Sequence, residues 1–176
     1  ENVAEYIVQI GENGIIDNKL ARGTIQVKKV DTLDKDKKLE NIEFNISANE
    51  DMRDIITTEK TNSEGVATFE NLEIGTYYIQ EAKQISGYTL NNTIYKVEVK
   101  QNADILSINC ENKPTEMEFS KVDETGTKEL PGATIQVIEK ETGNIIDEWV
   151  STEEKHKINY LEEGKEYIMR EITSPD

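Results

Sequence analysis

The sequence predicts an all-β chain built from tandem antiparallel β-sandwich domains. Its clearest segments are short, rich in β-branched and aromatic residues and bounded by turn residues, and no comparable stretch keeps a helical periodicity. The chain also repeats itself at intervals of 90 to 94 residues. With 176 residues and a hydrophobic content of 35%, two small cores fit this chain better than one large core.

Five segments carry the strand prediction. They cover residues 24–30, 42–48, 76–81, 94–99 and 105–110. Alternate side chains of a strand share one face, so the parity of a position predicts whether its side chain joins the apolar core.

Two matched pairs of segments define the repeat. Residues 25–31 match residues 117–123 at an offset of 92. Residues 75–81 match residues 164–171, with an offset of 90 between the final glutamates. The order of the segments is the same in both copies, so we interpret them as two related domains.

An asparagine closes the repeat. Asn112 ends the first full copy, and its upstream counterpart Asn18 lies 94 residues earlier. We therefore expect the chain to begin with the last hairpin of a preceding repeat, with a turn at 11–14. The predicted organisation is a terminal hairpin, one complete domain and one domain lacking its final hairpin, at residues 1–20, 21–114 and 115–176.

Composition argues against several classes of function. The net charge of −16 opposes a phosphate backbone, so nucleic acid is not an expected partner. A single cysteine, Cys110, and a single histidine, His156, allow neither an internal disulfide nor a metal cluster, so we expect no metal and no cofactor. His156 lies in a polar run and is expected to be exposed, without a role. No apolar run is long enough to cross a bilayer, so membrane insertion is not expected.

Three polar side chains share the parity of core positions in the first domain. Lys29 follows apolar residues at alternate positions, and so do Glu81 and Asn112. All three are therefore predicted to point inward. Burying a lysine and a glutamate costs several kcal/mol per ion, so we expect the site to hold compensating interactions.

The second copy repeats this arrangement. Lys121 and Glu171 have the parity of their first-domain counterparts, and Asn18 follows Ile16 in the same way in the terminal hairpin. These three residues are predicted to form a second site if the hairpin and the second domain meet.

Two interpretations of the three inward residues remain open at this point. One is a buried Lys–Glu ion pair with a hydrogen bond from the asparagine. The other is covalent: burial favours the neutral amine and the neutral acid, and a neutral amine can attack the carboxamide while the acid moves the proton. The products are an amide and ammonia.

The ordered motifs resemble those of CnaB-type domains, the collagen-adhesin B-repeat or SpaA-like pilin Ig-like domains of Gram-positive surface proteins. The matching first-domain segments lie, in order, at residues 29–31, 61–72, 75–81 and 87–88. The second copy is also similar to the adhesin domain from which peptide-tag and catcher pairs were made. The sequence departs from the family at Asn41, where a glycine is usual, and this puts the loop geometry in question.

The resemblance implies a residue role for each position of the site. It implies a reactive lysine at Lys29, a catalytic glutamate at Glu81 and an acceptor at Asn112, joined by an autocatalytic isopeptide bond. Lys121 and Glu171 match the same pattern in the second copy. The implied fold is a tandem of Ig-like β-sandwiches.

The predicted function is a non-enzymatic stalk or pilin-like repeat of a secreted adhesin at the cell wall, with neighbouring repeats or copies of the same chain as partners. Head-to-tail strand complementation is expected to place Asn18 beside Lys121 and Glu171. An alternative is a ligand-binding adhesin module that contacts a host matrix protein. A hydrolase using Glu81 or Glu171 is disfavoured, because neither has a visible second carboxylate.

Overall fold

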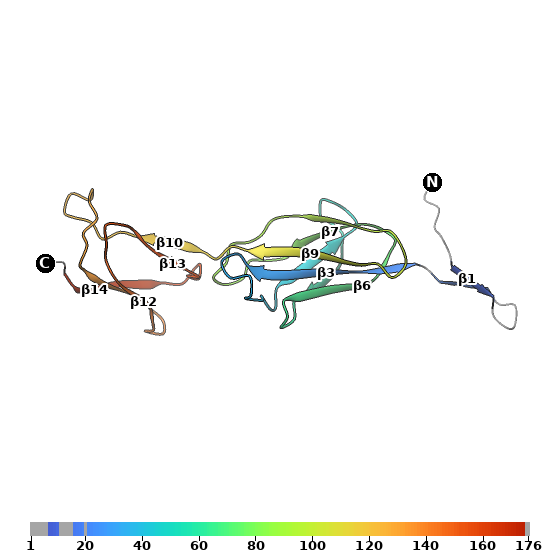
Figure 1. Cartoon of the computed structure of the whole chain (residues 1–176), viewed down its shortest axis with the longest axis horizontal. Coiled ribbons are helices and arrows are strands. Elements are labelled where there is room, and N and C mark those ends of the chain that lie inside the picture. The colour runs from blue at the N-terminus through green and yellow to red at the C-terminus, as the bar shows by residue number, and fades with distance from the viewer. Residues whose placement is uncertain (1–6, 11–15, 20, 175–176) are drawn as a thin grey trace. The chain divides into compact units, whose positions relative to one another are not determined.

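The computed structural model describes residues 7–10, 16–19 and 21–174 (Figure 1). All regular structure in these ranges is β-strand, and they contain no helix that could cross a membrane. The fold is therefore all-β, as predicted. The chain separates into two compact units, the first formed by the described parts of Glu1–Ile85 and Leu90–Lys113, and the second by Ser86–Thr89 with the described part of Pro114–Asp176.

The first unit is a sandwich of two sheets. One sheet has the strand order β6-β3-β9 and the other the order β5-β4-β7-β8. All neighbours are antiparallel except β3 and β9, which are parallel. The strands are β3 (Arg22–Asp31), β4 (Glu43–Ser47), β5 (Ile55–Lys60), β6 (Val66–Glu73), β7 (Gly75–Glu81), β8 (Tyr95–Val99) and β9 (Ile105–Asn112).

The first and last strands of this unit lie side by side (Figure 1). Eight residue pairs join β3 to β9 in parallel, from Thr24 opposite Ile105 to Asp31 opposite Asn112. The burial of β3 alternates strictly over its whole length, as a strand with one face on the core requires. This register places Lys29 opposite Cys110. Asn112 lies opposite Asp31, two residues after the lysine.

Apolar side chains from both sheets fill the space between them. The most deeply buried are Ile25, Val27, Phe44, Ile46, Ala67, Phe69, Ile79 and Val99. Lys29 has the largest side chain among the residues under 2% exposed, so this core surrounds a titratable group. Burying a charged group destabilises the fold unless its partners are buried with it.

The second unit repeats part of this topology. Its sheets have the orders β10-β13 and β12-β11-β14, which correspond to β3-β6 and β5-β4-β7. Counterparts of β8 and β9 do not occur among its described residues. The strands are β10 (Glu116–Phe119), β11 (Thr134–Glu139), β12 (Ile145–Val150), β13 (His156–Asn159) and β14 (Tyr167–Thr173).

The core face of the second unit is only partly covered. Met117 is 51% exposed and Met169 is 55% exposed, whereas their first-unit counterparts Ile25 and Ile79 are fully buried. Two positions that belong to the core in the first unit are therefore open in the described part of the second unit. In the first unit β8 pairs with β7 and β9 pairs with β3, at the edges of the corresponding face. The described part of the second unit has no counterpart of β8 or β9, so this face is less covered there.

A hairpin precedes the sandwich strands of the first unit. β1 (Ile7–Ile10) pairs antiparallel with β2 (Ile16–Lys19), and Asn18 lies opposite Val8. The predicted turn at 11–14 lies outside the described residues. So does the environment of the Asn18 side chain.

Two sequence expectations need correction or explanation. His156 is not an exposed loop residue: it lies on β13, its ring stacks on Trp149 with centroids 4.2 Å apart, and its Nε2 is 2.8 Å from Asp147 Oδ2. Asn41 takes the place of the usual glycine with φ of 62°, a left-handed conformation that asparagine adopts more readily than most residues.

Candidate functional site: a buried lysine, glutamate and asparagine

The three inward residues of the first unit meet between its two sheets. Lys29 comes from β3, Asn112 from the end of β9, and Glu81 from the end of β7 in the opposite sheet. The side chains of Lys29 and Glu81 are 0% exposed, and Asn112 is 0% exposed. The prediction that all three point into the core is confirmed.

Their polar atoms form a closed ring of hydrogen bonds. Lys29 Nζ donates to Glu81 Oε2 at 2.8 Å and to Asn112 Oδ1 at 2.5 Å. Asn112 Nδ2 donates to Glu81 Oε1 at 2.9 Å. One carboxylate therefore contacts both nitrogen atoms, the amine through one oxygen and the carboxamide through the other.

A fourth side chain, Cys110, completes the surroundings of the amine. Its Sγ lies 3.0 Å from Lys29 Nζ, and the cysteine is 1% exposed. The ring of Phe44 lies with its centroid 5.5 Å from the same nitrogen, within the range of a cation–π contact. Cys110 was not predicted to take part in the site, although it precedes Asn112 by two positions and so shares its face.

Tyr95 and Asn91 also contact the sulfur of Cys110. Tyr95 Oη is 3.3 Å from Cys110 Sγ, and Asn91 Nδ2 is 3.5 Å from it. Asn91 Nδ2 also donates to the carbonyl of Glu111 at 2.9 Å. Burial, followed by the contact with Cys110, raises the pKa of Tyr95 to about 12, so the phenol keeps its proton at neutral pH.

The aspartate that follows the lysine motif has a structural role. Asp31 is 0% exposed, and its Oδ1 accepts the backbone N–H of Leu33 at 2.7 Å, closing the turn after β3. In the second unit Asp123 Oδ1 accepts the N–H of Thr127 at 3.2 Å. A hydrogen bond from the Thr125 hydroxyl is the main cause that lowers the pKa of Asp123.

The second unit brings its predicted lysine and glutamate together in a more open setting. Lys121 Nζ lies 3.5 Å from Glu171 Oε2, and the two side chains are 28% and 37% exposed. Within the described residues Glu171 is the only ion-pair partner of Lys121. The pairing of Asn18 with these two residues stays a prediction, since its side chain lies outside the described part.

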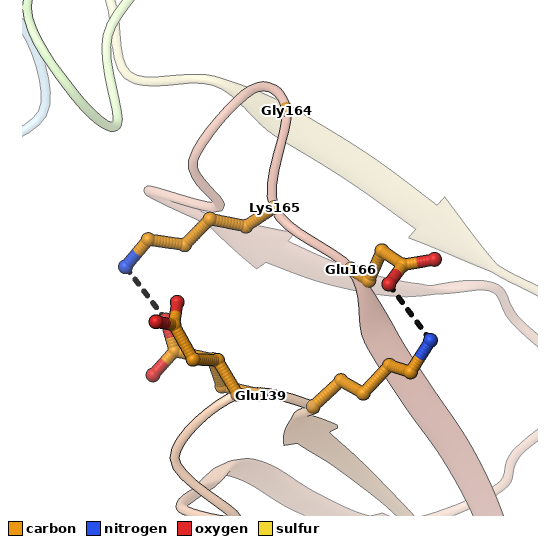
Figure 2. A pocket seen from close by; sticks show the side chains of 6 residues that line it. Glu139, Gly164, Lys165 and Glu166 are labelled. Carbon is orange, nitrogen blue, oxygen red and sulfur yellow. Dashed lines mark hydrogen bonds and ion pairs between the residues drawn. The ribbon is translucent and has the colours of Figure 1, made fainter.

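A charged cavity of about 430 Å³ lies elsewhere in the second unit (Figure 2). Lys165 Nζ lies 2.6 Å from Glu139 Oε1 and Lys140 Nζ lies 2.7 Å from Glu166 Oε2. The bond with Lys165 is the main cause that lowers the pKa of Glu139. These four charges already pair with one another, so the cavity offers no unpaired group among them to a ligand. Nowhere in the described ranges do three or more His, Cys, Asp or Glu side chains form a metal-binding group.

Comparison with known proteins gives one family and several related structures. The model of the SpaA prealbumin-like fold domain matches residues 23–114 and again 115–176. No sequence among curated proteins matches the chain.

Two solved structures illustrate the likeness. The Bacillus anthracis TIE protein is 28% identical with a TM-score of 0.65, over 90% of this chain and 30% of its own. A variant of BcpA, the major pilin subunit of Bacillus cereus, is 17% identical with a TM-score of 0.50, over 65% of this chain and 32% of its own. This chain thus spans about a third of either protein. The two matched regions cover most of its length, and the chain belongs to the SpaA prealbumin-like, or CnaB-type, domain family with two tandem units.

Proposed function

We propose that the first unit matures by joining Lys29 Nζ to Asn112 Cγ in an amide bond, with Glu81 as the proton carrier. The observation that carries this proposal is the single carboxylate that contacts both nitrogen atoms, at 2.8 and 2.9 Å. During amide formation Lys29 Nζ must lose protons and Asn112 Nδ2 must gain one. A group between the two can perform both transfers without solvent.

Glu81 carries protons in both directions during the proposed reaction. Glu81 takes a proton from the Lys29 ammonium, and the neutral amine attacks Asn112 Cγ. The C–Nδ2 bond then breaks as Glu81 returns the proton to Nδ2, and ammonia leaves. A further proton from Lys29 Nζ passes to Glu81, which ends as the neutral acid beside a neutral amide.

Energetics favour this outcome over a permanent ion pair. A buried ammonium and carboxylate cost several kcal/mol per ion, and their attraction offsets that cost only in part. The reaction replaces both ions with neutral groups. The bond also joins two residues separated by 83 positions, Lys29 and Asn112, which would remove about 4.5 kcal/mol of unfolded-state entropy on the model used for disulfides.

Intact mass tests the reaction. The chain is expected to weigh less than its sequence by one ammonia for each bond, with a peptide joining Lys29 to Asn112 after proteolysis. Glu81→Gln is expected to have the full sequence mass, since an amide cannot carry the proton. Glu59→Gln, a change at a partly exposed strand position of the same sheet, is the matched control. A full mass in the unmodified chain would contradict the proposal.

A structural role at the cell surface follows from this maturation. These are structural pilin-like domains and not enzymes, and a single-turnover cross-link strengthens a domain without acting on a substrate. We place the chain in the extracellular stalk of a Gram-positive surface protein, with neighbouring repeats or pilin-like subunits as partners. The alternative, a module that binds a host matrix protein, is tested by binding to immobilised matrix proteins.

A second candidate function concerns strand complementation of the second unit. The exposed Met117 and Met169 mark a core face that β8 and β9 flank in the first unit. In the first unit β8 and β9 lie in different sheets, whereas β1 and β2 pair with each other, so the hairpin would have to open to replace them. Residues 8 and 10 are apolar like residues 97 and 99 at an offset of 89. Separated strands from a second copy would add one strand to each sheet and bring Asn18 to Lys121 and Glu171.

Denaturing electrophoresis tests this complementation. A ladder of multimers is expected if the amide forms between copies, and Lys121→Ala is expected to abolish it. Lys128→Ala, an exposed lysine in the same unit, should leave the ladder unchanged. A single monomeric band for the unmodified chain would contradict covalent exchange.

A further inference from the structure

The contacts of Lys29 point to a role for Cys110 that the reaction scheme above does not use. We propose that Cys110 is a positioning residue for amide formation, whose sulfur orients the Lys29 amine toward Asn112. This inference rests on the proposed Lys29–Asn112 reaction. Cys110 neither gains nor loses atoms in it.

The donor count of the lysine supports this role. An ammonium has three N–H donors, and the buried Lys29 nitrogen has three partners: Glu81 Oε2 at 2.8 Å, Asn112 Oδ1 at 2.5 Å and Cys110 Sγ at 3.0 Å. Without the sulfur one buried donor would have no partner among these atoms. The amine could then turn about its terminal bond, and its lone pair would face Asn112 Cγ less often.

The sulfur is itself held in place. Tyr95 Oη and Asn91 Nδ2 approach it at 3.3 and 3.5 Å, and the amide of Asn91 is anchored on the carbonyl of Glu111 at 2.9 Å. The parallel register of β3 and β9 sets Cys110 directly opposite Lys29. Fixed backbone and fixed side-chain neighbours therefore define where the sulfur lies, as a positioning role requires.

Transfer of the first proton to Glu81 leaves the amine with two N–H groups and a lone pair that faces Glu81. A turn about the Cε–Nζ bond that ends with one N–H on Cys110 Sγ and the other on Glu81 then directs the lone pair at the remaining neighbour, Asn112. Reaction requires this orientation, and small departures from it slow bond formation. A thiol that only filled space would not impose it.

Two substitutions separate positioning from packing. Cys110→Ser keeps a hydrogen-bond acceptor at the position, and Cys110→Val keeps an apolar group without one. If the sulfur orients the amine, the serine variant should form the bond within about threefold of the unmodified rate and the valine variant roughly tenfold or more slowly. Cys110→Ala and Tyr95→Phe extend the series, since the first removes the acceptor without added bulk and the second removes a hydrogen bond to the sulfur.

The rate of bond formation can be followed after cell-free synthesis of the full chain. Synthesis is stopped at a defined moment, and samples taken at intervals afterwards are quenched in acid denaturant. Intact mass then gives the fraction that has lost one ammonia. Folding of each variant is checked by thermal unfolding in a Glu81→Gln background, where no bond forms. Equal rates for the serine variant and the acceptor-free variants that fold would overturn the positioning role. Full mass in every chain, including the unmodified one, would instead reject the underlying reaction.

Discussion

Replacing Asn112 by alanine removes the acceptor of the proposed bond while leaving Lys29 and Glu81 paired at 2.8 Å. Loss of the closure between residues 83 positions apart would lower the free energy of unfolding by about 4.5 kcal/mol. For a domain of this size each kcal/mol shifts the melting temperature by about 4–8 °C. The first unit is therefore expected to melt about 20–35 °C lower in Asn112→Ala, with the lost hydrogen bonds adding to the effect.

Differential scanning calorimetry can resolve this effect, and the chain supplies an internal reference. Its single tryptophan, Trp149, lies in the second unit, so fluorescence follows that unit alone. The Trp149 transition should not move. Asn109→Ala, at an exposed position of the same strand, is the matched control and should change stability by no more than about 0.5 kcal/mol. A first-unit transition that falls by only a few degrees would refute the cross-link reasoning.

Three further outcomes are expected. Asn112→Asp should lose water in place of ammonia and reach the same final mass as the unmodified chain, which intact mass can verify against a Lys29→Arg version. Cys110 should resist thiol reagents in the native chain and react after denaturation, because it is 1% exposed; rapid native labelling would contradict its burial. Glu139 has a lowered pKa, so its pairing with Lys165 should stabilise the second unit above the ordinary glutamate pKa and lose that effect as pH falls through the lowered value. Accordingly, the fluorescence-detected stability difference between Lys165→Met and the unmodified chain should shrink on acidification, and a constant difference would argue against it.

Strand parity was sufficient to predict the buried site of the first unit. Lys29, Glu81 and Asn112 each follow apolar residues at alternate positions, and the structure buries all three. Parity does not say which strands pair or in which register, which is why the contact of Cys110 on β9 with the amine on the neighbouring strand β3 was not foreseen. It also gave no signal for β5, whose positions are all at least partly exposed.

The second unit marks another limit of sequence patterns. Lys121 and Glu171 keep the parity of their counterparts, yet they are 28% and 37% exposed. Parity predicts which face a side chain takes, whereas burial depends on what covers that face. Because the described part of this unit has no counterpart of β8 or β9, the same pattern gives a partly open ion pair.

The parallel pairing of β3 and β9 also determines how the first unit would respond to pulling. The sandwich strands of the first unit run in sequence from the start of β3 to the end of β9. Opposed forces on those two points slide the neighbouring strands along each other, so the eight paired positions are loaded together in shear and not unzipped one at a time. An amide from Lys29 to Asn112 would carry the load straight from one strand to the other. The residues between them would then stay folded as the chain on either side is drawn taut.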